Sequence, residues 1–333
     1  GSRTATGHGG GPMTLPVGHG GSRTATGHGG GSRTATGHGG GPMTLPVGHG
    51  GSRTAVRLYM LLWAVQSMVL GMMHGMVQIM ARTIALAMQK GGVGKTTTAL
   101  NLGVMLAARG RRVLLVDLDP QANLTQGLGV DPAGLEYSVY EVLLNPEHGS
   151  AFATRSLSDG LDLIPASLDL AGAELELAGR VGRELLLRKA LRAAQNQYDY
   201  ILLDPPPSLG LFALNALAAA EMVLVPLQLH AYALRALPPL EATIALVREI
   251  NPPLRIGGIV CTMADRRTNL SQQIEQQVRA QYGDLVFTTV IPFNIRLAEA
   301  PAAGASIATF APQSAGAQAY AALATELEER YGR

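Results

Sequence analysis

The stretch 88–98 reads Met-Gln-Lys-Gly-Gly-Val-Gly-Lys-Thr-Thr-Thr, and it decides the fold of this chain. Its glycines let the backbone bend so that successive N–H groups point at one centre, and a helix that begins at Lys95 adds the positive end of its dipole. This combination favours an anion site. Lys95 supplies a point charge to the outer phosphates of a nucleotide, and the Thr96 hydroxyl can bind Mg²⁺, which prefers oxygen ligands.

The flanks of this stretch agree with a phosphate-binding loop. Residues 83–87 are predicted to form a short buried strand, and residues 97–109 carry helical apolar spacing that stops at Gly110. The ordinary P-loop pattern requires a glycine where this chain has Gln89, and Lys90 is the unusual residue that follows it. The sequence therefore predicts the strand, loop and helix of a P-loop, with a second lysine in the loop.

Two further apolar runs end in carboxylates. Residues 112–116 lead to Asp117 and Asp119, and residues 200–203 lead to Asp204 and three prolines. Ligands of open α/β sheets bind at the carboxyl ends of the strands. Alternate residues of an extended chain point the same way, so Asp117 and Asp119 could both face the phosphates and their metal, and one could order an attacking water. Asp204 is typical of a Walker B carboxylate, which holds Mg²⁺ usually through water.

Strand-like and helical segments alternate along residues 80–333. The alternation predicts one doubly wound, mostly parallel α/β sheet with helices on both faces, as in P-loop NTPases. The predicted strands lie near 83–87, 112–117, 161–165, 200–204, 222–227, 255–262 and 286–290. The predicted helices lie near 96–109, 169–195, 211–220, 232–250, 269–282 and 313–331.

Three of these motifs together resemble a known family. Residues 90–97, 117–123 and 204–210 are similar to the nucleotide motifs of the ParA/Soj-type partition ATPases, the deviant Walker A branch of P-loop proteins. The similarity covers essentially all of residues 80–333. It continues through Thr262-Met263, Arg267–Ser271, Val290–Pro292, Asn294–Pro301 and Gly316–Tyr320.

The resemblance implies a Mg²⁺-dependent ATPase that forms a homodimer with ATP and hydrolyses it slowly without a partner. In this family Lys90 would reach across the dimer interface to the partner's ATP, while Lys95 and Thr96 would serve the nucleotide of their own subunit. Asp119 would assist hydrolysis, so the expected catalytic residues are Lys90, Lys95 and Asp119. The expected nucleotide contacts are Lys90, Gly91, Gly92, Val93, Gly94, Lys95, Thr96, Thr97, Pro292 and Asn294, the last two at the adenine. The expected Mg²⁺ ligands are Thr96, Asp119 and Asp204.

The resemblance also implies nonspecific binding of double-stranded DNA in the ATP state, and segregation of chromosome or plasmid DNA with a ParB-type centromere-binding protein. The protein would then be cytoplasmic and associated with the nucleoid. Phosphate contacts require only cationic donors, and the candidates are Arg266, Arg267 and Arg296. Other positions that are often basic in the family are not basic here: Phe293, Ala303, Ala305, Gln313 and Ala315. This pattern predicts weaker or more salt-sensitive DNA retention.

Two other functions remain open. A MinD-like ATPase that cycles on membranes or positions cargo uses the same nucleotide fold, but it ends in a basic amphipathic helix, whereas residues 323–333 are acidic before their last residues. A nucleotide-switched scaffold would bind ATP and dimerise without hydrolysis. A nitrogenase-type iron protein is excluded because the chain has one cysteine, and an iron–sulfur cluster needs several.

The first quarter of the chain differs in composition from the rest. Residues 1–55 repeat two ten-residue units that are rich in glycine, and with so few large apolar groups we expect disorder there. Repeats this similar suggest translated upstream DNA, with the native start near Met80. Residues 56–79 are apolar and rich in methionine, and we expect them to be translated leader sequence. The alternatives are a membrane span or an amphipathic appendage, since the uncharged run 58–81 is long enough for either.

Charge is also distributed unevenly. The formal net charge of the whole chain is +2, but residues 1–79 hold five arginines and no acidic residue, so the remainder carries −3. Any binding of nucleic acid by residues 80–333 must therefore depend on a local basic patch and not on the global charge.

Overall fold

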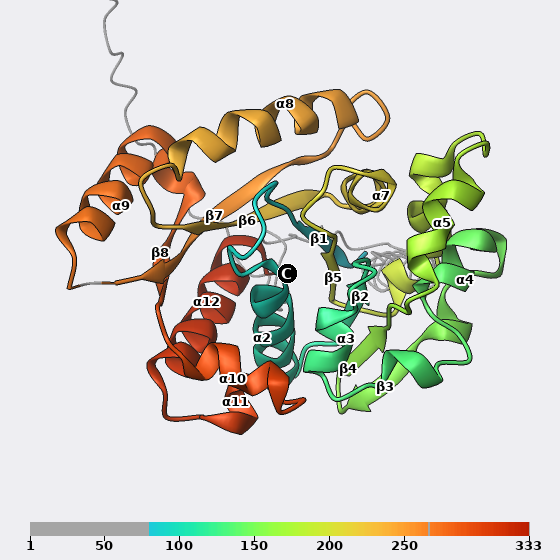
Figure 1. Ribbon diagram of the computed structural model, residues 1–333, viewed down its shortest axis with the longest axis horizontal. Helices are drawn as coiled ribbons and strands as arrows, with labels where there is room; N and C mark the ends of the chain where they lie inside the picture. The colour runs from blue at the N-terminus through green and yellow to red at the C-terminus, as the bar shows by residue number, and fades with distance from the viewer. Residues whose placement is uncertain (1–79, 266, 333) are drawn as a thin grey trace, which may run out of the picture. The chain divides into compact units, whose positions relative to one another are not determined.

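A mostly parallel sheet of eight strands runs through the residues that the computed structural model describes, 80–265 and 267–332 (Figure 1). The strand order is β3-β4-β2-β5-β1-β6-β7-β8, and in this part of the chain β3 alone runs antiparallel to its neighbour. The strands are β1 (Arg82–Leu86), β2 (Val113–Asp117), β3 (Arg155–Ser158), β4 (Leu161–Ile164), β5 (Tyr200–Asp204), β6 (Met222–Gln228), β7 (Arg255–Ala264) and β8 (Val286–Pro292). The predicted doubly wound, mostly parallel sheet is confirmed.

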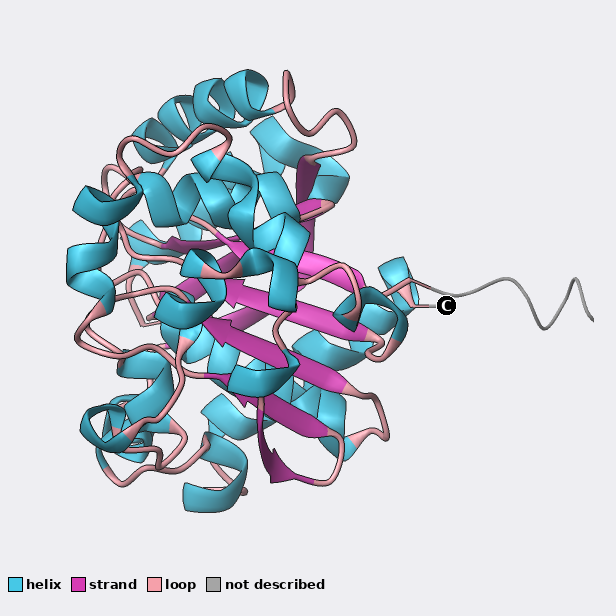
Figure 2. Ribbon diagram, turned by 90° about the vertical axis from the view of Figure 1, so that its right-hand side faces the viewer, coloured by secondary structure: helices cyan, strands magenta, loops and turns pink. Residues whose placement is uncertain are grey.

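Helices cover both faces of the sheet, and Figure 2 shows the strands between them. One face carries α2 (Lys95–Ala108), α3 (Asn123–Gly127), α10 (Arg296–Ala302), α11 (Ile307–Phe310) and α12 (Ala315–Tyr331). The other face carries α4 (Val139–Leu144), α5 (Leu170–Leu177), α6 (Leu186–Ala190), α7 (Leu211–Ala219), α8 (Leu237–Val247) and α9 (Asn269–Tyr282). Two cores therefore form, one on each face.

The alternation of side chains along each strand explains the two cores. In β1, Ile84 and Leu86 pack on the face of α2, whereas Ala85 packs on the opposite face. All five residues of β2 and all five of β5 are buried, as expected for strands covered on both sides. These central strands end at one edge of the sheet, which brings together the loops that follow β1, β2, β5 and β6.

The predicted elements agree with the structure except where short or polar segments lack a periodic signal. The edge strand β3 was not predicted, because its four residues are mostly exposed and polar. The helix predicted over 169–195 is interrupted between α5 and α6, where Gly179 and Gly182 provide flexible backbone and Gly182 has φ 71°. The short helices α3, α4, α10 and α11 were also not predicted.

The expectations for the leader fall outside the described residues. They concern the repeats of 1–55 and the apolar segment of 56–79, including nearly all of the candidate membrane span. Within residues 80–265 and 267–332, no helix combines the length and apolar character needed to cross a bilayer.

Helix α12 protects the edge of the sheet at β8. The Glu326 carboxylate accepts hydrogen bonds from the backbone N–H groups of Thr288, at 2.6 Å, and Thr289, at 2.8 Å, and pairs with Arg330 at 2.6 Å. Burial by itself would raise the pKa of Glu326, but these donors outweigh it and lower the pKa. One carboxylate thereby satisfies two N–H groups of an edge strand, which would otherwise be open to pairing with another chain.

We predict that Glu326→Gln lowers the free energy of unfolding by about 1–3 kcal/mol at pH 7, because the amide supplies one acceptor for two N–H groups. A carboxyl with a lowered pKa contributes stability above the pKa of the unfolded chain and loses it as the pH falls through the folded value. The difference between variant and parent should therefore shrink toward pH 3. Urea unfolding followed by circular dichroism measures it. The exposed Glu329→Gln is the control, and equal midpoints for both variants would contradict the prediction.

Candidate nucleotide and magnesium site

The loop between β1 and α2 has the backbone that its glycines require. Gly92 and Gly94 have φ angles of 73° and 95°, in the left-handed region that residues with a Cβ rarely adopt. No described atom lies within 4 Å of a Cβ placed at either position, so the requirement is conformational and not steric. Gly94 precedes the first residue of α2, Lys95. The loop is also tied to the sheet, since the Thr262 hydroxyl on β7 donates to the Val93 carbonyl at 2.9 Å.

A buried lysine and a buried carboxylate lie at the start of α2 and the end of β5. Burial lowers the pKa of Lys95, and the negative charges of Asp204 and Asp119 partly oppose that shift. Burial and the charge of Asp117 raise the pKa of Asp204 well above its usual range. The Thr96 hydroxyl, which lies nearby without the geometry of a hydrogen bond, and the charge of Lys95 oppose the rise. Among the described residues, neither carboxylate oxygen of Asp204 has a hydrogen-bond partner, and no lysine or arginine pairs with it.

Asp204 is therefore a candidate ligand for a cation. A buried carboxylate without a partner is costly, and a bound cation would remove that cost. No group of three or more His, Cys, Asp or Glu in the described part of the chain could hold a metal by itself. Mg²⁺ at nucleotide sites does not require one, because it usually takes one or two protein carboxylates and receives its other ligands from phosphates and water.

The carboxylate of Asp117 is held by hydrogen bonds within its own loop and α3, whereas we expected it to face the phosphates and their metal. This fully buried carboxylate accepts hydrogen bonds from the Thr125 hydroxyl at 2.7 Å, the Thr125 N–H at 2.9 Å and the Asp119 N–H at 3.1 Å. Burial nevertheless raises its pKa to about 6. Asp117 thus holds α3 and the loop after β2. The half-buried Asp119 accepts from the Gln121 N–H at 3.0 Å and is the carboxylate of this loop that remains near Lys95.

Lys90 lies on the surface beside the end of β6. Its ammonium is 3.3 Å from Gln228 Oε1 and 2.6 Å from His230 Nε2. Neither Gln228 nor His230 was predicted as a site residue from the sequence. The signal that could have found them is their position, since polar residues directly after a buried strand of a parallel sheet lie at its ligand-binding edge.

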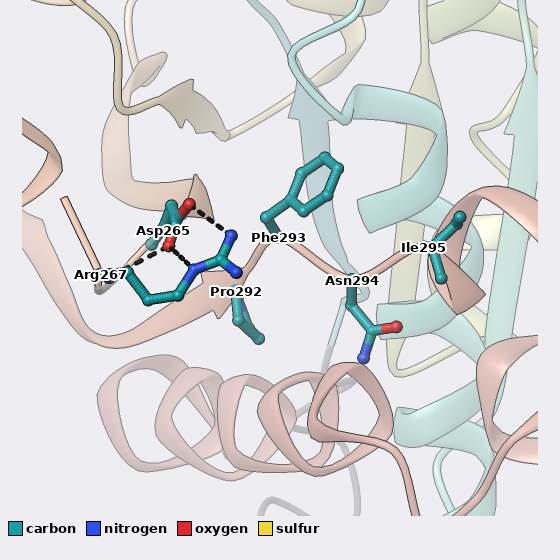
Figure 3. Close-up of a pocket in the computed structure, with 7 residues that line it drawn as sticks. Asp265, Arg267, Pro292, Phe293, Asn294 and Ile295 are labelled. Carbon is teal, nitrogen blue, oxygen red and sulfur yellow. Dashed lines mark hydrogen bonds and ion pairs between the residues drawn. The ribbon is translucent and has the colours of Figure 1, made fainter.

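The two residues predicted at the adenine line one pocket. Pro292 and Asn294, at the end of β8, line an open cavity of about 500 Å³ at the carboxyl ends of β7 and β8 (Figure 3). Its other lining residues are Ala264, Asp265, Arg267, Phe293 and Ile295. Phe293 and Ile295 are about two-thirds exposed, so they offer apolar surface to a planar base.

The candidate DNA-binding arginines are exposed but paired with neighbouring carboxylates. Arg267 forms two side-chain hydrogen bonds with Asp265, at 2.8 and 2.9 Å, and its proximity lowers the pKa of Asp265 to about 2. Arg296 pairs with Glu299 one turn along α10, at 2.9 Å. Arg266 lies outside the described residues. Exposed pairs of this kind are weak, so a phosphate group can compete for either arginine.

The fold and its glycine-rich loop place the chain among the P-loop nucleoside triphosphatases. A family model described as an AAA domain matches residues 81–256. The chromosome-partitioning ATPase Soj of Thermus thermophilus is 53% identical over 257 residues, covering 77% of this chain and 98% of that protein. The chromosome partitioning protein ParA of Caulobacter vibrioides is 47% identical over 252 residues, covering 75% and 94%.

Solved structures give the same result for the fold. A crystal structure described as cobyrinic acid a,c-diamide synthase from Mycobacterium smegmatis, with a bound ATP analogue and magnesium, has a TM-score of 0.65 and 41% identity. The match covers 76% of this chain and 97% of that one. Together with the relatives above, this shows that the chain belongs to the ParA/Soj family of chromosome-partitioning ATPases.

We predict that Asp204→Asn stabilises the protein in EDTA at pH 7.5 by at least about 1 kcal/mol, because it removes an uncompensated buried charge. A carboxyl with a raised pKa contributes its full stability below the pKa of the unfolded chain and loses it as the pH rises through the folded value. The advantage of the variant should therefore shrink toward pH 4. Urea unfolding with the exposed Asp159→Asn as control tests this. An Asp204→Asn variant less stable than the parent at pH 7.5 would refute it.

Proposed function

We propose that this protein is a Mg²⁺-dependent ATPase that dimerises with ATP, binds DNA nonspecifically in that state, and segregates chromosome or plasmid DNA with a ParB-type partner. The observation that carries the proposal is the unpartnered buried carboxylate of Asp204 beside Lys95 and Thr96, at the phosphate loop of a ParA/Soj family member. The relative from Mycobacterium smegmatis, which was solved with an ATP analogue and magnesium, supports ATP and Mg²⁺ as the ligands.

The residues of the loop have distinct roles in this proposal. Backbone N–H groups of residues 91–97 cradle the phosphates, and Lys95 neutralises the charge that develops on the γ-phosphate. Thr96 and Asp204 would hold Mg²⁺, directly or through water, and Asp119 would support the metal and orient the attacking water. Bound there, Mg²⁺ would supply positive charge to neutralise the phosphates. Pro292 and Asn294 hold the base in the pocket beside β8.

Lys90 is the residue that makes the active site depend on dimerisation. It is exposed and contacts the end of β6, and within the described residues it forms no hydrogen bond or ion pair with Lys95 or Asp204 of its own subunit. An exposed cation at the edge of the nucleotide site is available to a second subunit. We infer that it reaches the partner's nucleotide.

The membrane-cycling alternative is disfavoured by the packing of the last helix. Leu323, Ala324 and Leu327 of α12 are fully buried against the sheet and α2. The large apolar side chains that a bilayer would need are therefore already used in the core. The exposed residues of this helix include no lysine or arginine: they are Ala315, Gln318, Ala321, Ala322 and Glu329. We propose DNA, and not a membrane, as the surface on which the protein acts.

We predict that Mg²⁺ and ATP shift the mass of the Asp119→Ala protein from monomer to dimer in light scattering, since this variant should retain ATP. Adding Lys90→Ala should prevent most of the shift, because the partner's phosphates lose a cation. The control is Lys189→Ala, which removes a lysine that pairs with Glu147 and lies far in sequence from the phosphate loop. This variant should dimerise normally. Normal dimerisation without Lys90, or a permanent monomer in its presence, would contradict this reading.

The exposed pair of Arg296 and Glu299 predicts opposite effects on DNA binding. With ATP, Arg296→Glu should weaken duplex binding and reduce its salt dependence, since fewer phosphates are neutralised. Glu299→Gln should strengthen binding several-fold, because it frees the guanidinium of Arg296. Filter binding over a range of salt, with ATP, ADP and no nucleotide, measures both effects. Equal binding in all three nucleotide states would leave a dimerising ATPase without a DNA function.

A further inference from the structure

The contact between Lys90 and the residues after β6 has more hydrogen-bond donors than His230 can accept. His230 Nδ1 lies 3.0 Å from the backbone N–H of Tyr232, which can only donate. Its Nε2 lies 2.6 Å from the Lys90 ammonium, which also only donates. A neutral imidazole has one accepting nitrogen, so these two donors compete for a single lone pair. An imidazolium has none, and it would repel both.

Other charges near this contact do not relieve the competition. The Tyr232 ring lies 6.5 Å from the imidazole, and the Arg235 guanidinium lies 5.4 Å over that tyrosine. In the described part of the chain neither Lys90 nor His230 forms an ion pair with a carboxylate. Burial and the charge of Lys90 accordingly lower the pKa of His230. Of the three hydrogen-bond contacts among Lys90, Gln228, His230 and Tyr232, only the one to Gln228 Oε1, at 3.3 Å, uses an acceptor for which no second donor competes.

We propose that Gln228 and His230 form a resting dock that holds Lys90 on its own subunit, and that protonation of His230 releases Lys90 toward the nucleotide of a second subunit. This inference rests on the proposed ATP-dependent dimerisation and adds its regulation. Gln228 and His230 are positioning residues, because they act through Lys90. Weakening the dock should favour the dimer, since Lys90 no longer has to leave its contacts before it crosses the interface.

The size of the effect follows from the contacts that are lost. Removal of one net hydrogen bond should tighten the ATP-dependent dimer about 3- to 10-fold. The parent should show part of this gain between pH 8 and pH 5.5, as a growing fraction of the imidazole becomes charged and repels the ammonium. A variant without the imidazole should already be tight at pH 8 and should lack this part of the pH dependence.

Sedimentation velocity in the Asp119→Ala background, with Mg²⁺ and ATP at pH 8 and pH 5.5, tests the release. His230→Ala is compared with His148→Ala, which removes the other histidine of the described residues from an exposed turn. We expect tighter, less pH-dependent dimerisation for His230→Ala and parental behaviour for His148→Ala. A His230→Ala dimer that matches the parent in affinity and pH dependence would overturn the proposal.

A second measurement tests the dock without nucleotide. The ring protons of His230 are titrated by NMR in the full-length parent and in Lys90→Met. Loss of the neighbouring ammonium should raise the pKa of His230, and an unchanged titration would overturn the dock. If the parent remains monomeric with ATP, the proposed dimerisation and the release step fail together, whereas the titration still decides whether Lys90 rests on His230.

Discussion

The structure depends on the cost of burying charge where the central strands end. Asp117 and Asp204 are paired in register on neighbouring strands β2 and β5, and both are removed from water. Thr125 donates hydrogen bonds to Asp117 and so anchors α3, whereas Asp204 has no hydrogen-bond partner among residues 80–265 and 267–332. Burial raises the pKa of Asp204 and lowers the pKa of Lys95, in each case against the attraction of the other charge. A nucleotide with its cation would place positive charge beside Asp204 and so offset the cost of burying this carboxylate.

The two lysines of the loop divide the work because their surroundings differ. Lys95 is buried at the start of α2, which fits our proposal that it serves the nucleotide of its own subunit. Lys90 is exposed, and its ammonium competes with the Tyr232 N–H for the one accepting nitrogen of His230. Moving Lys90 away from this contact therefore costs little free energy. Helix α12, in contrast to Lys90, is held firmly in place. Its buried leucines and the Glu326 carboxylate close the face and the edge of the sheet beside β7 and β8.

The surface charges fit a protein that binds a polyanion weakly and reversibly. Arg267 and Arg296 have partners on their own segments, at Asp265 and Glu299. These ion pairs reduce the local positive charge. Because they are exposed, breaking them costs little free energy. A DNA surface of this kind gains strength mainly by doubling its contacts, which a dimer would provide. The net charge of −3 outside residues 1–79 argues for the same dependence on local contacts.

The sequence by itself determined the sheet, the phosphate loop and the carboxylates at the strand ends. Buried parallel strands are continuous apolar runs, and the left-handed backbone at Gly92 and Gly94 requires glycine, so both leave a local signal. Only the tertiary structure separated Asp117 from Asp119, because their roles depend on Thr125, eight residues beyond Asp117. It alone revealed the links of Lys90 to His230 and of Val93 to Thr262, which join residues more than a hundred positions apart. Such contacts arise from strand order, and no local pattern encodes strand order.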